Sequence, residues 1–194
     1  DVANKEKGIV IGTGDLSELA LGWCTYNGDH MSMYAVNIGV PKTLIRHLVN
    51  WYMKKEDNNK KTILDDILKT PISPELLPPD KDGNIVQKTE NSIGSYILHD
   101  FFLYHFLRHG LSPKKLYYIA VKTFDEYKKE EILKCLKIFI TRFFTQQFKR
   151  NCLPDGIKVG SISLSPRGDL RLPSDLNYQI YLKEIEELES SDNL

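Results

Sequence analysis

The stretch GTGDLSELALGWCTYNGDHMSMY, residues 12–34, decides the fold class of this chain. It follows a short apolar run at 8–11 that predicts a buried strand ending at a glycine. Because ligands bind outside the carboxyl ends of strands in open α/β sheets, the polar residues that follow stand where an α/β fold would place a site. The same stretch also fits a strand, an Asp or Ser helix cap and an Asn-Gly turn without any site. The polar residues in question are Thr13, Asp15, Ser17 and Glu18.

This stretch closely resembles the synthetase domain of NAD synthetases, particularly of the bacterial glutamine-dependent kind. The resemblance continues through VPKTLIRHLVNW at 40–51, TPISPELLPPD at 70–80, QKTENSIGSYILHDFFLYHFLRHG at 87–110 and FKRNCLPDGIKVGSISLSPRGDLRLPSD at 148–175. It is collinear over nearly all of the 194 residues, so the chain is identified as a member of that family. The resemblance implies a ligase that uses ATP to adenylate the carboxylate of deamido-NAD, after which ammonia displaces AMP to give NAD.

One family motif is missing from the sequence. Members of the family carry a Ser-Gly-Gly-x-Asp-Ser pyrophosphate loop, and no such string occurs here. The glycines of GTGD at 12–15 lack the spacing and the lysine of a P-loop. We therefore expect the C-terminal part of a synthetase domain of the Rossmann-like adenine nucleotide alpha-hydrolase (ATP pyrophosphatase) fold, with DVANKEK at 1–7 as the tail of a cut helix. An upstream glutaminase domain would supply ammonia, and residues 1–194 alone should be inactive.

Composition excludes several classes of partner. Lys and Arg total 26, as do Asp and Glu, so no net field attracts nucleic acid or an anionic membrane. No apolar run approaches the roughly 18 residues of a membrane span, and no secretory signal opens the chain. The three cysteines lack metal-ligand spacing, which favours reduced thiols and a cytoplasmic setting.

The C-terminal half is predicted to be mostly helical. Apolar periodicity and capping residues predict helices at 43–54, from a Thr62 cap to Pro71, and at 96–107 with Gly110 as C-cap. Further helices are predicted from Ser112-Pro113 onward and at 127–148. The chain ends in an acidic helix that starts at Tyr181, with an acidic tail at about 183–194. Residues 70–92 contain four prolines and Gly83, so we expect a mobile loop that closes over nucleotide.

Aromatic and histidine residues in this half could suggest a cofactor site. The aromatic stripes at 101–106 and 139–144 are better explained by core or dimer packing, since apolar helix stripes are normally buried. His105 and His109 are four residues apart, but no HExxH motif accompanies them, so we expect packing or surface roles.

Three residues are implied by the resemblance to contact ATP. Lys42, just before a helix start, matches a lysine on the phosphates, and Ser73 matches a hydroxyl that arrives when the loop closes. Thr13 matches a threonine at the nucleobase or ribose end. Without the resemblance, they would be a solvated helix-end lysine, a turn serine and a helix-capping hydroxyl.

Glu18 is implied to hold Mg²⁺, to contact deamido-NAD, or to do both. Mg²⁺ keeps several waters and takes only one or two carboxylates besides phosphate oxygens, so a single glutamate is enough. The alternative is an exposed first-turn glutamate that interacts favourably with the helix dipole.

The remaining implied contacts are with deamido-NAD. Trp23, Cys24, Thr25 and Tyr26 match a stretch that lines its pocket, where the two aromatic rings could stack on nicotinate or adenine. Cys24 replaces a commoner small residue, so its contact could be through the backbone alone. Asp29 matches an acid near the nicotinate carboxylate and could orient the incoming ammonia. Lys149 matches a basic residue that reaches deamido-NAD across a homodimer interface. Without the resemblance, Trp23 and Tyr26 would be taken as core residues and Lys149 as a charge at the end of a helix.

Two further readings of the chain stay open. It could be a non-catalytic nucleotide-binding or dimerisation module derived from the same fold. It could also belong to another ATP pyrophosphatase that activates a carbonyl, although WCTY at 23–26 and FKR at 148–150 argue against that. A Ser-Gly-Gly loop encoded upstream would favour the ligase over the module.

Overall fold

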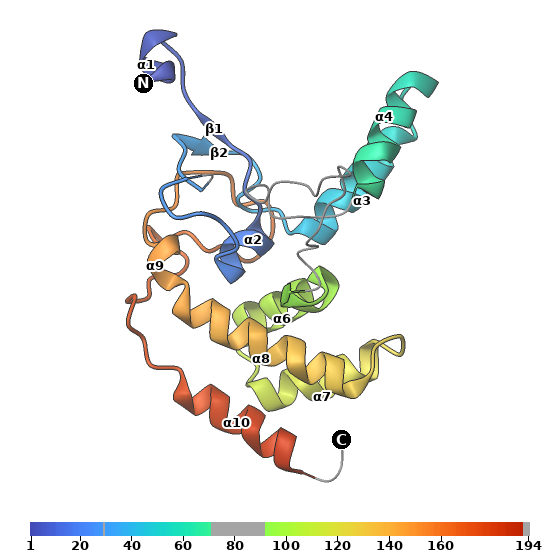
Figure 1. The fold of residues 1–194 in the computed structure, drawn as a ribbon, viewed down its shortest axis with the longest axis vertical. Coiled ribbons are helices and arrows are strands. Elements are labelled where there is room, and N and C mark those ends of the chain that lie inside the picture. Colours follow the sequence, from blue (N-terminus) through green and yellow to red (C-terminus); the bar gives the residue numbers. More distant parts are fainter. Residues whose placement is uncertain (29, 71–91, 192–194) are drawn as a thin grey trace, which may run out of the picture.

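The structure, a computed structural model, describes residues 1–28, 30–70 and 92–191. Figure 1 shows a helical body below, a small sheet above it and a helical hairpin that projects to one side. The predicted loop at 70–92 lies almost wholly outside the described residues. The described helices are α1 (Val2–Lys5), α2 (Leu16–Leu21), α3 (Lys42–Met53), α4 (Asn58–Lys69), α6 (Tyr96–His109), α7 (Pro113–Thr123), α8 (Lys129–Thr145), α9 (Gln147–Arg150) and α10 (Gln179–Ser190).

The described sheet consists of two short parallel strands, β1 (Ile11–Gly12) and β2 (Tyr34–Ala35). The prediction of a buried strand over 8–11 was wrong. The strand begins only at Ile11, and the side chains of Ile9 and Val10 are 63% and 47% exposed. An apolar run indicates a strand but not what covers it, and β1 pairs only with β2 among the described strands.

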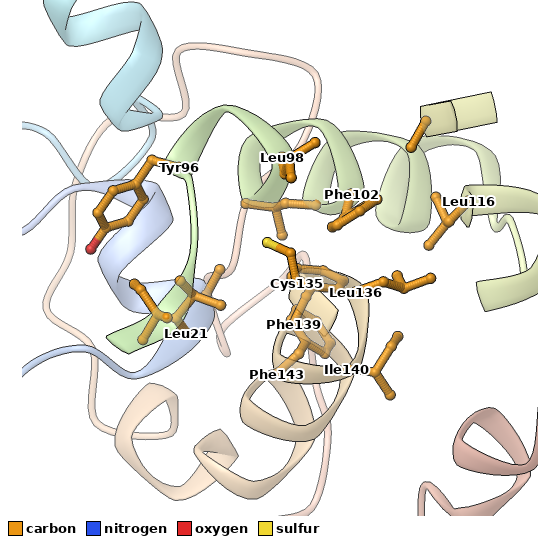
Figure 2. Close-up of a cluster of buried hydrophobic side chains, with 14 of the residues drawn as sticks. Leu21, Tyr96, Leu98, Phe102, Leu116, Cys135, Leu136, Phe139, Ile140 and Phe143 are labelled. Atoms are coloured by element: carbon orange, nitrogen blue, oxygen red, sulfur yellow. The ribbon is translucent and has the colours of Figure 1, made fainter. Parts of the chain in front are cut away.

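The hydrophobic core is built around α8, which packs against α2, α6, α7 and α10. Figure 2 shows Phe102 of α6 facing Phe139 and Phe143 of α8, and all three are fully buried. The buried members of the aromatic stripes are therefore core residues, as predicted, whereas Tyr104 is 40% exposed. The ring of Phe144 stacks on Tyr181, with centroids 5.1 Å apart, and so brings α10 against α8.

Most predicted helix boundaries agree with the structure to within two residues. The start of the second helix does not, nor does the end of the helix predicted at 127–148, because α8 ends at Thr145 and α9 follows it. Gly110 is a left-handed C-cap and Pro113 opens α7, as expected. The prediction that Thr62 caps the second helix was wrong, because α4 begins at Asn58 with Asp57 as its N-cap. The Thr62 hydroxyl instead donates to the Asn58 carbonyl within the helix. The polar residues before Thr62 hid this start, because Asn58, Asn59 and Lys60 are exposed in the first turn of α4.

No helix in the described part of the chain is long and apolar enough to cross a membrane.

Two C-cap glycines provide a matched test of packing at the end of α2. Gly22 and Gly110 have similar left-handed φ angles of 58° and 62°. A Cβ at Gly110 would meet nothing within 4 Å, whereas one at Gly22 would overlap the side chain of Gln146. Gly110→Ala should therefore lower the free energy of unfolding by only about 1–2 kcal/mol, the cost of a left-handed backbone conformation for a residue with a Cβ. Gly22→Ala should lower the free energy of unfolding by roughly 1–3 kcal/mol more, because the added methyl group overpacks the contact with Gln146. Urea unfolding midpoints measure both, and equal losses would contradict the close packing at Gly22.

Candidate functional site

Helix α2 starts directly after β1 and is capped by its own carboxylates. The Asp15 Oδ1 atom accepts the Glu18 N–H at 2.9 Å, and Glu18 Oε2 accepts the Asp15 N–H at 3.2 Å. This reciprocal arrangement is a capping box, which satisfies two backbone donors at the helix start. The helix cap expected in this stretch is thus Asp15, and Thr13 is exposed before it.

Lys42 joins the two carboxylates at this helix start. Its Nζ atom lies 2.7 Å from Asp15 Oδ2 and 2.8 Å from Glu18 Oε1. It also lies 5.2 Å from the centroid of the Tyr96 ring. A lysine ammonium has three N–H donors, so two are used here and one is left for another acceptor.

Burial and mutual charge set the protonation of these groups. Burial and the neighbouring Glu18 raise the pKa of Asp15, Lys42 lowers it, and the resulting pKa is about 6. Burial lowers the pKa of Lys42, but the two carboxylates more than offset that, so its pKa is raised overall. At neutral pH Asp15 is therefore ionised beside the Lys42 ammonium, and it takes up a proton near pH 6.

The first turn of α3 is held by side chains from other helices. Pro41 occupies the N-cap position and offers no capping side chain. Ser17 Oγ accepts the Lys42 N–H at 2.8 Å and donates to Asp100, whose Oδ2 accepts the Thr43 N–H at 3.0 Å and hydroxyl at 2.7 Å. Burial raises the pKa of Asp100, against the lowering effect of these hydrogen bonds. Together, α2 and α6 supply the cap that the α3 sequence lacks.

The other end of α2 is bonded by cations from α8 and α9. Gly22 closes the helix in a left-handed conformation, and the Trp23 N–H returns to the Glu18 carbonyl at 2.8 Å, as in a Schellman motif. The backbone carbonyls between Ala20 and Cys24 accept hydrogen bonds from side chains of α8 and α9. The donors are Arg150 to Ala20 at 2.7 Å, Arg142 to Leu21 at 2.9 Å, and Lys149 to Gly22 at 2.8 Å and Cys24 at 2.7 Å.

The predicted pocket segment 23–26 begins at this bonded helix end. The guanidinium carbon of Arg142 lies 4.8 Å from the centroid of the Trp23 ring. Lys149, predicted to reach deamido-NAD across a dimer, lies in its own chain against the segment that it was expected to serve. Two of its three donors are used by the Gly22 and Cys24 carbonyls.

The second half of the segment is anchored by a buried histidine. His30 Nδ1 lies 3.0 Å from the Thr25 carbonyl oxygen, and Nε2 lies 3.3 Å from Cys152 Sγ. The Tyr26 ring lies 5.4 Å from each of the His30 and Phe148 rings and is 47% exposed. The backbone here is fixed while Thr25 and Tyr26 face solvent.

The structure thus brings the predicted site residues together in two groups. Glu18 and Lys42 lie at the start of α2, and the segment 23–26 with Lys149 lies at its end. Six helical residues separate the groups by about 9 Å. Asp29 and Ser73 lie outside the described residues, so their roles stay predictions.

Sequence reasoning did not assign roles to Asp100, Arg142 and Arg150. All three act on elements that are distant in the sequence, and helical periodicity does not reveal such contacts. The one signal in the sequence for such a role was an arginine placed on the apolar, and therefore buried, side of a helix. Arg150 is fully buried, and burial lowers its pKa to about 9.

The described residues do not form a Mg²⁺ site on their own. No group of three or more His, Cys, Asp or Glu side chains gathers among them. Both oxygens of Glu18 are already bonded, one of them to an ammonium that would repel a cation. His105 and His109 stack with centroids 5.3 Å apart, as packing histidines do.

Comparison with known proteins points to a single family. The family model described as NAD synthase matches residues 1–137. The chain is 42% identical over 207 aligned residues to glutamine-dependent NAD(+) synthetases of Mycobacterium leprae and Mycobacterium tuberculosis. These alignments include 95% of this chain but 30% of each relative, so the chain spans less than a third of their length.

A solved structure has the same fold. A glutamine-dependent NAD(+) synthetase from Cytophaga hutchinsonii superposes with a TM-score of 0.71 over 97% of this chain and 28% of that one, at 22% identity. The α/β class is consistent with this likeness. The Rossmann-like strand order stays a prediction, because the described sheet has two strands.

Asp15→Asn tests the buried carboxyl while keeping a side chain that can cap α2. The pKa of Asp15 rises from 3.8 to about 6 on folding, so the folded state binds this proton more tightly. The resulting stability is complete below about pH 4 and is lost as pH rises through about 6. Between those limits, the wild-type free energy of unfolding should fall by about 2–3 kcal/mol relative to the variant. Urea unfolding across this pH range measures the difference, and a constant difference would contradict the shift.

Proposed function

This chain belongs to the NAD synthase family, and we propose that it is the C-terminal part of the synthetase unit of a glutamine-dependent NAD synthetase. The full-length enzyme would use ATP to adenylate the carboxylate of deamido-NAD and release pyrophosphate. Ammonia, made from glutamine by an upstream domain, would then displace AMP and give NAD.

The observation that carries this proposal is the ammonium of Lys42 at the carboxyl end of β1. Asp15 and Glu18 hold it in place, and its third N–H donor is available for a phosphate oxygen of ATP. A fixed cation of this kind stabilises negative charge as pyrophosphate leaves, without reorganising during the reaction. The Lys42 and Thr43 N–H groups at the start of α3 are already bonded to Ser17 and Asp100, so Lys42 acts here through its side chain.

The second group of residues suits the other substrate. Lys149 keeps one free donor after binding the Gly22 and Cys24 carbonyls, and we assign that donor to deamido-NAD. Trp23 and Tyr26 offer aromatic faces on either side of Cys24 and Thr25. Thr13 and Ser73 on ATP, and Asp29 on ammonia, complete the proposal from the family resemblance alone.

Mg²⁺ would enter with the phosphates of ATP, whose charge it neutralises. Glu18 is the proposed protein ligand among the described residues; it would release Lys42 when the metal binds, before the reaction, and Asp15 would keep the ammonium in place. A contact between Glu18 and deamido-NAD needs the same release. A homodimer and a cytoplasmic setting also belong to the proposal.

The first test compares two helix-start glutamates in the full-length enzyme. Glu18 and Glu131 both occupy the third helical position and accept the backbone N–H of the N-cap residue, but only Glu18 contacts Lys42. Glu18→Gln should lower NAD formation about 10²-fold, the scale lost with one preorganised charge-stabilising group. Glu131→Gln should leave it unchanged.

Product analysis accompanies that comparison. The wild-type enzyme should release AMP and pyrophosphate, whereas release of ADP would rule out adenylation. Equal turnover of wild type and Glu18→Gln would reduce Glu18 to a helix cap. A full-length enzyme that binds ATP and makes no NAD would favour the non-catalytic module.

A mixing experiment tests which subunit Lys149 serves. Because Lys149 is bonded to the Gly22 and Cys24 carbonyls of its own chain, we expect it to act on its own pocket. In heterodimers of a Lys149→Ala subunit and a Glu18→Gln subunit, each of the two sites should then carry one defect. The activity of these heterodimers should therefore stay low. Recovery toward half of wild-type activity would show instead that the site is shared between chains.

A further inference from the structure

Three cations meet the carbonyl end of α2, and one of them differs from the others in position. Arg150 is fully buried beneath the helix, and Lys149 lies on the segment that follows it. Arg142 alone combines a bond to the helix end with a contact to an aromatic ring of the predicted pocket. It is partly buried and comes from α8 in the core.

The contacts of Arg142 fix it in one orientation. Its Nε donates to the Leu21 carbonyl at 2.9 Å and its Nη2 approaches the Gly22 carbonyl at 3.4 Å. The guanidinium carbon lies 4.8 Å from the centroid of the Trp23 ring, within the range of a cation–π contact. A planar guanidinium presents its donors in a fixed fork and can lay its flat face on a ring, whereas a lysine ammonium is a compact point charge on a flexible stem.

These contacts serve orientation more than charge pairing. Burial lowers the pKa of Arg142, so its charge is held at a cost. No carboxylate among the described residues forms an ion pair with it, and its partners are helix-end carbonyls and the Trp23 ring. The negative end of the α2 dipole compensates part of its charge.

We propose that Arg142 is a positioning residue that holds the Trp23 ring in place for deamido-NAD. The inference rests on the proposed function, which assigns Trp23 to the deamido-NAD pocket. Arg142 acts through Trp23 and through the carbonyl end of α2. Lys42 and Glu18 lie at the opposite end of the helix, so binding of ATP should not depend on Arg142.

Steady-state kinetics of the full-length enzyme separate this role from simple stabilisation. Arg142→Lys keeps the charge and loses the planar fork. It should raise the KM for deamido-NAD roughly tenfold, a change equivalent to about 1.4 kcal/mol. The KM for ATP and kcat should change less than twofold. Arg108→Lys, an exposed arginine of α6, is the matched control and should match wild type.

A double-mutant cycle tests whether the effect passes through Trp23. In a Trp23→Leu background, Arg142→Lys should change the KM for deamido-NAD less than twofold, because the ring that it positions is gone. A full tenfold effect in that background would overturn the role assigned to Trp23. An unchanged KM in Arg142→Lys itself would overturn the proposal outright.

Hydrogen exchange provides a readout that does not need activity. In Arg142→Lys the amides at 22–25 should exchange at least about fivefold faster than in wild type, while those of α6 should not change. Unchanged exchange at 22–25 overturns the positioning role whatever the enzyme does. A wild-type protein that makes no NAD refutes the proposed function, and the exchange result then still decides whether Arg142 holds this segment.

Discussion

The described structure depends on the bonding of both ends of α2 by groups from outside it. A helix of six residues is unstable alone, because it leaves most of its backbone donors and acceptors without partners. Lys42 of α3 binds the capping carboxylates at its start, and Arg142 and Arg150 bind the carbonyls at its end. Helix α2 therefore joins the small sheet to the helical body, and the candidate site residues are positioned by the bonds that hold this joint.

Arg150 shows how tightly the joint is built. Its fully buried guanidinium donates to the carbonyls of Ala20 and Phe143 and to the side chain of Gln147. It also lies 4.5 Å from the Phe143 ring centroid. Burial lowers its pKa to about 9, so it is still charged at neutral pH. Carbonyl acceptors satisfy its donors without neutralising the charge, and removal of the side chain would leave several buried carbonyls without donors.

Local rules recovered those features of the chain that are themselves local. The Asp15 cap, the Gly110 C-cap and the Pro113 helix start each depend on residues within one or two turns, and all three are confirmed. The Asp100 cap on α3 was missed because its acceptor and donors are 57 residues apart. The exposure of Ile9 was missed because an apolar run does not reveal what packs against it. The family resemblance proposes Lys42 and Lys149 as site residues, and the structure shows the carboxylates and carbonyls that hold them.

The same bonds give α2 opposite charges at its two ends. Two carboxylates and one ammonium meet at its start, whereas Arg142, Lys149 and Arg150 meet at its end, where none of them forms an ion pair with a described carboxylate. Acids near a helix start and cations near a helix end both interact favourably with the helix dipole, so this distribution stabilises the helix. The excess positive charge lies beside the segment at 23–26, where the proposed substrate would bring a carboxylate and a diphosphate. The charges that stabilise this short helix are therefore of the sign that an anionic ligand at its end requires.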